Sequence, residues 1–409
     1  MVVTPSSIRD TVKPQEGEMT RRKLAALLVP LAALAALAVL AAGSASAAAK
    51  PIVIGWAFDG SGNMKPFDTP ALAAAQVRVK QWNAKGGVKG RPLQIVTCDT
   101  QGNTPKNAKS CAAKLLGQNV DIVFTTCDVE AAAPVVQDSI NAGKLTIAPC
   151  IGTDLMGPKR FGEKGRLAFS FGNVAQDEGA AMADFAYNKG WRTAAIATNT
   201  LLIYFKNVNQ AFEQRFTQLG GKVVGKESYA SFANNVGAAV GRIANTKADV
   251  YVTTTAFAEL PAFVSGIRSL NNNTPILNSW AGDGTYWNTK EPPVTNYYFV
   301  TFASAFGDDP LPAINTLAKQ IKAGTGGFVQ GTAAIDGIVT AINRSGGSTD
   351  GAKLAATMEK FKNVPTLSGL VSFSPEFHTV FGRQYRVMRI ENNVAKRIGL
   401  IKAGALPKI

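Results

Sequence analysis

The stretch of residues 52–128 constrains the fold of this chain more than any other. It opens with the near-continuous apolar run IVIGWA at residues 52–57, which is typical of a parallel strand that is covered on both faces. A loop with two glycines and a helical segment follow, and then a second strand, a second helix and a third strand. This βαβαβ order predicts a parallel, doubly wound sheet with right-handed crossovers.

Capping residues mark the helices of this stretch. Thr69 followed by Pro70 predicts the start of the first helix, because threonine caps a helix and proline fits its first turn. Thr104 before Pro105 predicts the start of the second helix in the same way, and Gly117 predicts its end.

The remainder of the chain repeats the pattern. A further strand is expected at residues 145–148, and a second series of strands is expected at 193–199, 222–229, 249–255 and 275–280, with helices between them. Helices expected at 312–322, 331–344 and 351–361 have no strand partners of their own, so we expect them to cover the first sheet. Residues 385–394 predict a hairpin with Asn392 and Asn393 at its turn.

The chain has 409 residues, 46% of them hydrophobic, which is too long for one compact domain. We therefore expect an α/β protein with two doubly wound lobes. Residues 49–171 and 303–368 are expected to form the first lobe, and residues 172–302 and 369–409 the second.

Residues 1–48 read as an export signal. Met19 opens a segment with three basic residues at 21–23, an apolar run at 24–42 and an Ala-x-Ala pattern that ends at Ala47. This order is that of a signal peptide cleaved near Ala47, with an additional extension before Met19. The apolar run is also long enough for a retained membrane anchor, which is the alternative. A lipid-modified amino terminus is not expected, because no cysteine stands near the cleavage site.

The net charge of +15 does not indicate a nucleic-acid-binding protein. Residues 1–48 hold five Lys/Arg and three Asp/Glu, so about +13 remains in the exported part. These basic residues are scattered among helices, without a dense run or interleaved aromatic residues. Affinity for anionic wall polymers or lipid headgroups is the more modest reading of this charge.

All four cysteines fall in the first lobe, an even number that suits an oxidising compartment. Sequence alone permits three pairings. We expect Cys98 to pair with Cys111, joining a strand end to the next helix, and Cys127 to pair with Cys150, joining the ends of adjacent strands. A metal site is the rival reading, and it is disfavoured by the single histidine and the lack of a Cys-x-x-Cys motif.

Catalytic and cofactor signatures are weak in this sequence. The single histidine, His378, is expected at the surface, and no Gly-x-Ser-x-Gly elbow accompanies it, so a serine hydrolase is not expected. Gly60 and Gly62 imitate a dinucleotide fingerprint, but Lys65 stands where the third glycine belongs. We expect no cofactor and no enzyme activity; an enzyme that uses paired carboxylates is the remaining catalytic alternative.

Two runs near the amino terminus carry a resemblance to a known family. Residues 83–93 (NAKGGVKGRPL) and the helix that opens at Pro105 and ends AKLL at 113–116 resemble the amino-terminal signature of the extracytoplasmic branched-chain amino acid binding proteins. The run GLVSF at 369–373 resembles that family's third crossover. The resemblance implies a type I periplasmic-binding-protein fold, with two lobes joined by three crossovers and a ligand in the cleft, feeding an ABC importer.

Ligands of open parallel sheets collect beyond the carboxyl ends of the strands. The loops that follow the predicted strands therefore hold the candidate ligand-binding residues, and closure of the lobes about a hinge is the expected motion. These candidates are Phe58, Ser61, Asn63, Asp128, Val129, Ile151, Gly152, Thr153, Tyr204, Phe257 and Asp283.

The resemblance also implies roles for some of these residues. Ser61 and Thr153 are placed to hold a ligand α-carboxylate, Asp283 to meet its ammonium group, and Tyr204 to pack on the ligand. The chain departs from the family at Asp128, where the family often shows serines. An acid at that position would repel a carboxylate, which opens the possibility of a ligand other than an amino acid.

The sequence thus predicts a secreted, periplasmic or wall-associated solute-binding protein. Its expected ligand is a small polar molecule, an amino acid of the branched-chain type or an amide-like compound. Its expected partner is the membrane permease of an ABC importer, and a monomer is expected. The alternative is a sensor domain that binds a ligand and reports to a partner without transport.

Overall fold

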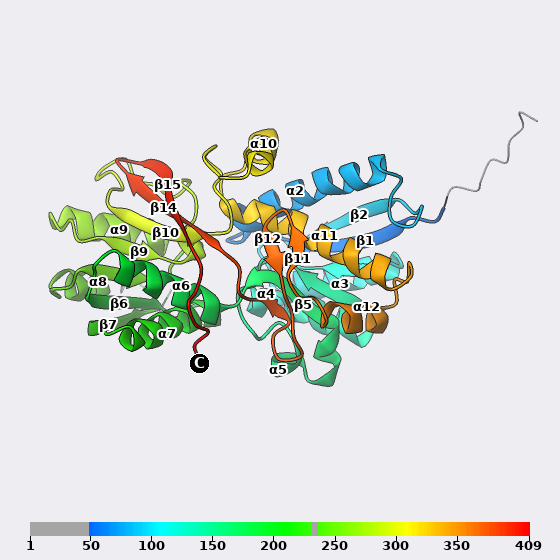
Figure 1. The fold of residues 1–409 in the computed structure, drawn as a ribbon, viewed down its shortest axis with the longest axis horizontal. Coiled ribbons are helices and arrows are strands. Elements are labelled where there is room, and N and C mark those ends of the chain that lie inside the picture. The colour runs from blue at the N-terminus through cyan, green and yellow to red at the C-terminus, as the bar shows by residue number, and fades with distance from the viewer. Residues whose placement is uncertain (1–48, 231–235) are drawn as a thin grey trace, which may run out of the picture. The chain divides into compact units, whose positions relative to one another are not determined.

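The computed structural model describes residues 49–230 and 236–409, so the predicted signal peptide lies outside the described residues. Residues Lys50–Ile409 form one compact unit that contains two large sheets (Figure 1). No helix within the described ranges is both long enough and apolar enough to cross a membrane.

The first sheet has six strands, all paired in parallel, in the order β13-β5-β4-β3-β1-β2. Five of the strands come from the first part of the chain, as the βαβαβ pattern predicts. Their bounds are β1 Ile52–Phe58, β2 Leu93–Asp99, β3 Ile122–Phe124, β4 Leu145–Ala148, β5 Ala168–Asn173 and β13 Thr379–Val380.

The second sheet has seven strands in the order β15-β14-β10-β9-β8-β6-β7. Its pairs are parallel except β10 with β14 and β14 with β15. The bounds are β6 Thr193–Asn199, β7 Lys222–Tyr229, β8 Val250–Thr253, β9 Ile276–Asn278, β10 Tyr297–Thr301, β14 Tyr385–Glu391 and β15 Val394–Ile401. A separate antiparallel pair joins β11 Val364–Thr366 to β12 Gly369–Val371.

Helices connect the parallel strands and cover the sheets (Figure 1). The α-helices are α2 Lys65–Ala84, α3 Pro105–Gly117, α4 Val129–Asn141, α5 Pro158–Phe161, α6 Ala175–Asn188, α7 Ile203–Gln218, α8 Val236–Ala244, α9 Glu259–Ser269, α10 Pro312–Ile321, α11 Val329–Arg344 and α12 Gly351–Met358. Short 3-10 helices are η1 Glu163–Leu167, η2 Trp280–Gly282 and η3 Gly326–Phe328. As expected for helices without strands of their own, α11 contacts α2 and β5, and α12 contacts β4; α10 differs, since it contacts α2 and packs in the cluster that contains Val300 and Phe302.

Several local predictions are confirmed. Thr104 caps α3, where its side chain accepts a hydrogen bond from the backbone N–H of Asn107. The antiparallel strands β14 and β15 form the predicted hairpin. Asn392 and Asn393 at its turn both have positive φ, as a tight turn between twisted strands requires. The α/β class with two doubly wound sheets is therefore the observed fold.

The start of α2 was predicted wrongly. The helix begins at Lys65, and Pro70 lies inside it. Proline has no N–H to donate to the carbonyl four residues earlier. That carbonyl, Pro66 O, instead accepts a hydrogen bond of 3.0 Å from Thr325 Oγ1, at the segment leading into η3. A residue from far along the chain thus replaces the hydrogen bond that the proline removes.

The tail differs from the expected lobe boundary. Residues 369–371 pair with β11, and β13 pairs with β5 of the first sheet, so the final passage to the second sheet lies between β13 and β14. His378, expected at the surface, is 1% exposed. Its ring stacks on Phe169 with centroids 4.1 Å apart, and its Nδ1 lies 2.9 Å from the carbonyl oxygen of Ala168. The apolar neighbours on β5 explain its burial.

A buried arginine joins the three passages between the sheets. Arg383, between β13 and β14, donates to Gln330 Oε1 at 2.6 Å and to the carbonyl oxygen of Phe171 at 3.1 Å. Gln330 in turn donates to the same carbonyl at 2.7 Å. Phe171 lies at the first passage and Gln330 at the second, so one hydrogen-bonded group connects the segments that any hinge motion must bend.

Candidate functional site

A small cavity, of about 30 Å³, lies between the carboxyl ends of the two sheets. Its wall combines loops from both lobes, as the rule for ligand sites in parallel sheets predicts. The first lobe contributes Met64, Phe67, Cys127, Asp128, Val129, Ile151, Gly152 and Thr153; the second contributes Leu202, Tyr204, Phe205, Ala256, Phe257, Trp280 and Ala281. We call this space the cleft cavity.

Seven of the candidate residues predicted from the sequence line the cleft cavity. They are Asp128, Val129, Ile151, Gly152, Thr153, Tyr204 and Phe257. Asn63 lines a neighbouring wider cavity of about 300 Å³, which shares Met64, Asp128, Leu202 and Phe257 with the first. The remaining candidates, Phe58, Ser61 and Asp283, lie outside the lining of both cavities.

Sequence reasoning missed three large side chains of the cavity wall: Met64, Phe67 and Trp280. Because the start of α2 was predicted too late in the sequence, Met64 and Phe67 were assigned to the loop before the helix. Trp280 is the last residue of a predicted strand, and the sequence does not indicate to which side its ring points.

Aromatic rings from the two lobes meet across the cavity. Phe67 of the first lobe lies 4.9 Å from Trp280 and 6.4 Å from Phe257, centroid to centroid, and both partners belong to the second lobe. Phe257 also lies 6.4 Å from Phe205. Such edge and tilted contacts stabilise the wall beyond the area that they bury.

Phe257 holds an unusual backbone conformation. Its φ of 56° places a bulky residue in the left-handed region, which costs roughly 1–2 kcal/mol relative to ordinary conformations. The conformation sets Phe257 in the wall of both cavities. Backbone strain of this kind clusters at ligand sites, and here it accompanies an observed cavity.

Tyr204 is fixed from behind by a buried acid. Its hydroxyl lies 2.9 Å from each carboxylate oxygen of Glu178, and Glu178 Oε1 accepts a further hydrogen bond of 2.6 Å from the backbone N–H of Trp280. Burial raises the pKa of Glu178 to about 8. One acid thus positions two aromatic residues of the cavity wall, Tyr204 and Trp280.

The ring of Tyr204 also touches the first lobe. A Cβ placed on Gly152 would stand 2.7 Å from Cε2 of Tyr204, closer than real contacts allow. Glycine at 152 is therefore what allows a second-lobe aromatic ring to approach the first-lobe backbone. The two residues close one side of the cleft cavity.

Asp128 is the only carboxylate of the cleft cavity wall in the described residues. It caps α4, because its Oδ1 accepts a hydrogen bond of 2.8 Å from the backbone N–H of Ala131. Burial, reinforced by the neighbouring charge of Glu130, raises the pKa of Asp128 to about 7. Arg160, whose side chain lies 3.9 Å from that of Glu130, acts in the opposite direction.

Asp283 forms hydrogen bonds to residues at the second passage between the sheets. Its Oδ2 accepts hydrogen bonds from Thr301 Oγ1 at 2.7 Å and from the backbone N–H of Gly326 at 2.6 Å. The residue is 1% exposed, and burial raises its pKa to about 7. Thr325, beside Gly326, is the residue that reaches Pro66 of α2. Asp283 therefore connects the second lobe to the segment that contacts the first.

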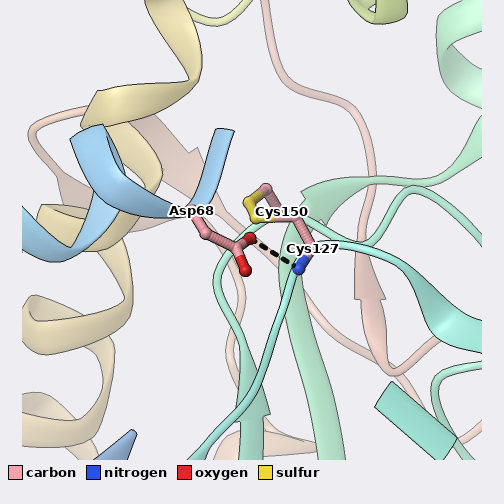
Figure 2. A group of neighbouring side chains, drawn as sticks. All are labelled: Asp68, Cys127 and Cys150. Atoms are coloured by element: carbon pink, nitrogen blue, oxygen red, sulfur yellow. Dashed lines mark hydrogen bonds between the residues drawn. A yellow bond between two sulfur atoms is a disulfide. The ribbon is translucent and has the colours of Figure 1, made fainter. Parts of the chain in front are cut away.

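Both expected disulfides are present, Cys98 with Cys111 and Cys127 with Cys150. Figure 2 shows Asp68 beside the second pair, where its Oδ1 accepts a hydrogen bond of 2.9 Å from the N–H of Cys127. Its other oxygen accepts one of 2.8 Å from the N–H of Asp59. Three ligand atoms of the metal-binding type meet here, but the two sulfurs are bonded to each other and are not available as thiolates.

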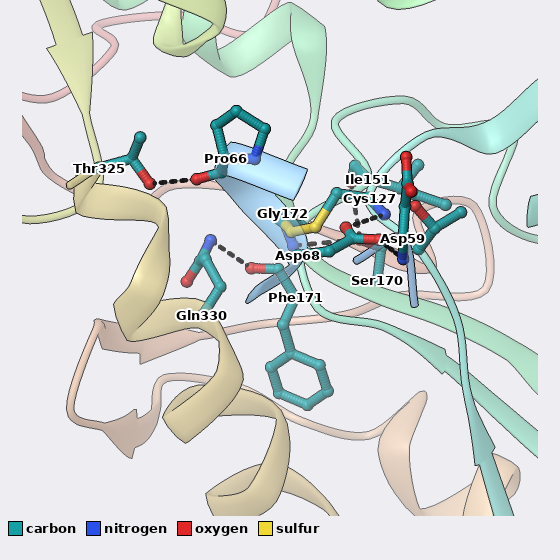
Figure 3. The surroundings of a disulfide bond; sticks show 12 residues. Asp59, Pro66, Asp68, Cys127, Ile151, Ser170, Phe171, Gly172, Thr325 and Gln330 are labelled. Atoms are coloured by element: carbon teal, nitrogen blue, oxygen red, sulfur yellow. Dashed lines mark hydrogen bonds between the residues drawn. A yellow bond between two sulfur atoms is a disulfide. The ribbon is translucent and has the colours of Figure 1, made fainter. Parts of the chain in front are cut away.

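The surroundings of this disulfide connect the cavity to the passages between the sheets (Figure 3). Ile151, which lines the cavity, accepts a hydrogen bond of 2.7 Å from Ser170 Oγ through its carbonyl. Gln330 and Phe171 of the arginine group lie in the same region, as does the contact of Thr325 with Pro66. Ile151 of the cavity wall and residues of the passages between the sheets therefore lie around the same disulfide.

Comparison with known proteins agrees with this geometry. The chain is 26% identical over 347 residues to the Leu/Ile/Val-binding protein homolog 3 of Brucella melitensis, covering 81% of this chain and 89% of the relative. Its structure is similar to that of the branched-chain amino acid transporter substrate binding protein LivJ from Streptococcus pneumoniae in complex with isoleucine, with a TM-score of 0.74, 20% identity and coverage of 86% of this chain and 100% of that one.

A second similar structure was solved with a different kind of ligand. It is the solute binding protein of an ABC transporter from Rhodopseudomonas palustris in complex with 3,4-dihydroxybenzoic acid, with a TM-score of 0.73, 16% identity and coverage of 87% of this chain and 99% of that one. At these identities, the two structures support the fold and leave the ligand of this chain open.

The family model of the periplasmic binding proteins matches residues 51–395, which is nearly the whole described chain. The match covers the first sheet, the second sheet up to the start of β15, the cleft cavity and all three passages between the lobes. The chain is a binding protein and not an enzyme, and it belongs to the periplasmic binding protein family.

Proposed function

We propose that this chain captures a small solute in the cleft cavity and delivers it to the membrane permease of an ABC importer. The observation that carries the proposal is the cavity itself, walled by residues that follow strand ends in both lobes. A ligand there would contact both lobes at once and stabilise them against each other. The two similar structures are named as substrate- or solute-binding proteins of transporters, which favours transport over the ligand-sensing alternative.

The ligand is a small molecule with a largely apolar body, of the size of a branched-chain amino acid, an amide-like compound or a single-ring compound. The wider cavity, of about 300 Å³, adjoins the cleft cavity of about 30 Å³, and its volume lies at the lower end of the range of small-molecule pockets. Isoleucine and 3,4-dihydroxybenzoic acid, bound by two similar structures, are both of this size. Ser61 lies away from the cavity wall, whereas Thr153 lines it and remains a candidate polar contact.

The site of action is outside the cytoplasm, as the periplasmic binding protein family implies. We propose that the chain arrives there through a signal peptide cleaved near Ala47, and that it acts as a monomer. We propose the lobe boundaries near residues 171, 302 and 380, where the chain passes between the two sheets.

Thermal unfolding of residues 49–409 in the presence of amino acids, amides, amines and aromatic acids tests the proposal. A compound that binds only the folded chain adds about 2.7 kcal/mol to the free energy of unfolding at a hundredfold excess over Kd, and it therefore raises the unfolding midpoint. The variant Gly152→Val should lose this response, because a side chain there collides with Tyr204.

Gly241→Val is the matched control, because Gly241 of α8 has open space around its Cβ position. It should respond to the ligand as the unmodified chain does. An equal ligand response of Gly152→Val and Gly241→Val would show that binding occurs away from the cleft cavity.

A further inference from the structure

The cleft cavity presents negative charge and aromatic faces to its ligand. Among the fifteen residues that line it there is one carboxylate, Asp128, and no Lys, Arg or His. The wider cavity beside it is lined by Asp59 and Glu130 as well as Asp128. The local charge is thus opposite in sign to the net charge of +15 of the whole chain. A chain that is basic overall has an acidic binding site.

Three sets of donors with which the wall could hold an anion already have partners, whereas the indole Nε1 of Trp280 has none. The N-terminus of α4, a natural anion site, is capped by Asp128 itself. The N–H of Cys127 donates to Asp68, and the N–H of Trp280 donates to Glu178. A carboxylate placed near Asp128 would meet another carboxylate in a poorly hydrated space, where like charges repel strongly.

The aromatic faces favour a cation. Rings attract positive charge through their electron-rich faces, most strongly when water is excluded. The wall holds Phe67, Tyr204, Phe205, Phe257 and Trp280, contributed by both lobes. A carboxylate together with several aromatic rings is a chemical match for an ammonium group with an apolar body.

We propose that the cleft selects an organic amine that carries no carboxylate, with its ammonium group at Asp128 and its apolar body among the aromatic rings. The inference rests on the proposed function, because it assumes that the cleft cavity is the solute site. It places the amine partner in the first lobe, at the start of α4, and not at Asp283 of the second lobe. Asp128 is then the residue that determines the charge of the ligand.

The start of helix α7 in the wall favours an anion, and it is the basis of the competing hypothesis. Helix α7 has no side-chain cap at Leu202, and Leu202 and Tyr204 both line the cavity. The helix end supplies partial positive charge of about half a unit, less than the charge of Asp128 once that acid is ionised. An amino acid could bind with its ammonium group at Asp128 and its carboxylate at the start of α7. The comparison of leucine with 3-methylbutylamine distinguishes this case from the proposal.

Binding measurements with ligands of one carbon skeleton and different charge test the proposal. The first set is 3-methylbutylamine, 3-methylbutan-1-ol and 3-methylbutanoate, with leucine added as the amine that carries one more carbon, its carboxylate; the second is benzylamine, benzyl alcohol and benzoate. Within at least one set, the amine should bind at least tenfold more tightly than the alcohol, the carboxylate and, in the first set, leucine. Calorimetric titration of residues 49–409 at pH 7.5 gives these ratios.

Asp128→Asn isolates the charge. Asparagine is an equally good helix cap, so α4 should remain intact. The variant should bind the amine and the alcohol within threefold of each other. Asp350→Asn is the matched control, because Asp350 caps α12 in the same way, through the N–H of Lys353, and lines neither cavity. It should keep the full preference for the amine.

The pH dependence gives a second readout. Because the pKa of Asp128 is raised to about 7, the charged form that attracts the ammonium group grows between pH 6 and pH 8. Affinity for the amine should rise about tenfold over this range, as expected for a single acid of that pKa. Affinity for the alcohol should stay constant, and Asp128→Asn should remove the rise. Glu130 and Arg160 are the other charged groups at this position.

Each remaining outcome overturns the inference. If the alcohol and the amine bind equally tightly, the cleft has no preference for a positively charged ligand. If Asp128→Asn keeps the preference for the amine, Asp128 is not the residue that causes it. Tighter binding of leucine or of a carboxylate contradicts the ligand class while leaving solute binding in the cleft intact. If no amine binds, the inference fails; a response to any other compound that Gly152→Val abolishes would still support the proposed function.

Discussion

The hydroxyl of Tyr204 lies within hydrogen-bonding distance of both carboxylate oxygens of Glu178, 2.9 Å from each. Glu178 lies on α6, behind the cavity wall, and its carboxylate also accepts a hydrogen bond from the backbone N–H of Trp280. Two aromatic residues that face the ligand space therefore depend on one buried acid. The pKa of Glu178, raised to about 8 by burial, keeps that acid largely protonated near neutral pH.

Glu178→Ala should weaken ligand binding by about tenfold, because Tyr204 and the N–H of Trp280 lose their shared acceptor, a loss of about 1–3 kcal/mol. Glu178→Gln should retain most of the affinity, since the amide keeps an acceptor for both groups. Titration of each variant with the tightest compound of the panel measures this. Glu227→Ala, which removes an exposed ion pair with Arg242, is the control and should leave affinity unchanged.

Phe257 can be tested by a pair of substitutions that separate strain from contact. Phe257→Gly and Phe257→Ala both remove the ring and should weaken binding to a similar extent. Glycine adopts the left-handed backbone without penalty, so Phe257→Gly should be more stable than Phe257→Ala by about 1 kcal/mol. Urea unfolding compares their stability. Equal stability of the two variants would show that the backbone at 257 relaxes when the ring is removed.

Asp283 should act on stability and not on ligand choice. Asp283→Ala leaves Thr301 and the N–H of Gly326 without their buried acceptor, which should cost roughly 2 kcal/mol of unfolding free energy. The ratio of amine to alcohol affinity should be unchanged, the opposite of the result for Asp128→Asn. Loss of that ratio in Asp283→Ala would instead place Asp283 at the ammonium group of the ligand.

Stability should fall as pH rises from about 4 to about 8. Burial raises the pKa of Asp68 and of Asp283 from 3.8 to about 7, and that of Glu178 from 4.5 to about 8. The folded chain therefore holds protons that the unfolded chain has already released, and raising the pH favours unfolding. His378, whose pKa is lowered, acts in the opposite direction below about pH 6.5.

The measurement for this prediction is the urea midpoint at pH 5 and at pH 8. The midpoint should be lower at pH 8, and Glu178→Gln should show a smaller difference between the two values than the unmodified chain. A midpoint that rises between pH 5 and pH 8 would mean that the buried acids release their protons in the folded state.

The architecture could be predicted because its signals are local and repeated. Buried parallel strands have apolar runs, and the Thr104 cap and the Asn392-Asn393 turn carry their conformations in their own chemistry. The two disulfides followed from the expected adjacency of strand and helix ends. Each of these signals is readable from a few neighbouring residues.

The features that were missed depend on contacts between distant segments. Pro70 lies inside α2 because Thr325 supplies a donor to Pro66, and no local pattern announces a partner 259 positions away. His378 is buried by stacking on Phe169 of β5. Asp283, for which the resemblance implies contact with a ligand, accepts hydrogen bonds from Thr301 and Gly326 through Oδ2 and lies outside the lining of both cavities.

Hydrogen exchange of the whole exported chain, with and without a saturating amount of the tightest-binding compound, tests the central claim most directly. If the ligand binds in the cleft cavity, protection should increase in segments of both lobes, at residues 127–131 and 151–155 and at residues 202–205 and 256–258. Protection confined to one lobe, or centred on the separate cavity around residues 244–249, would contradict the account.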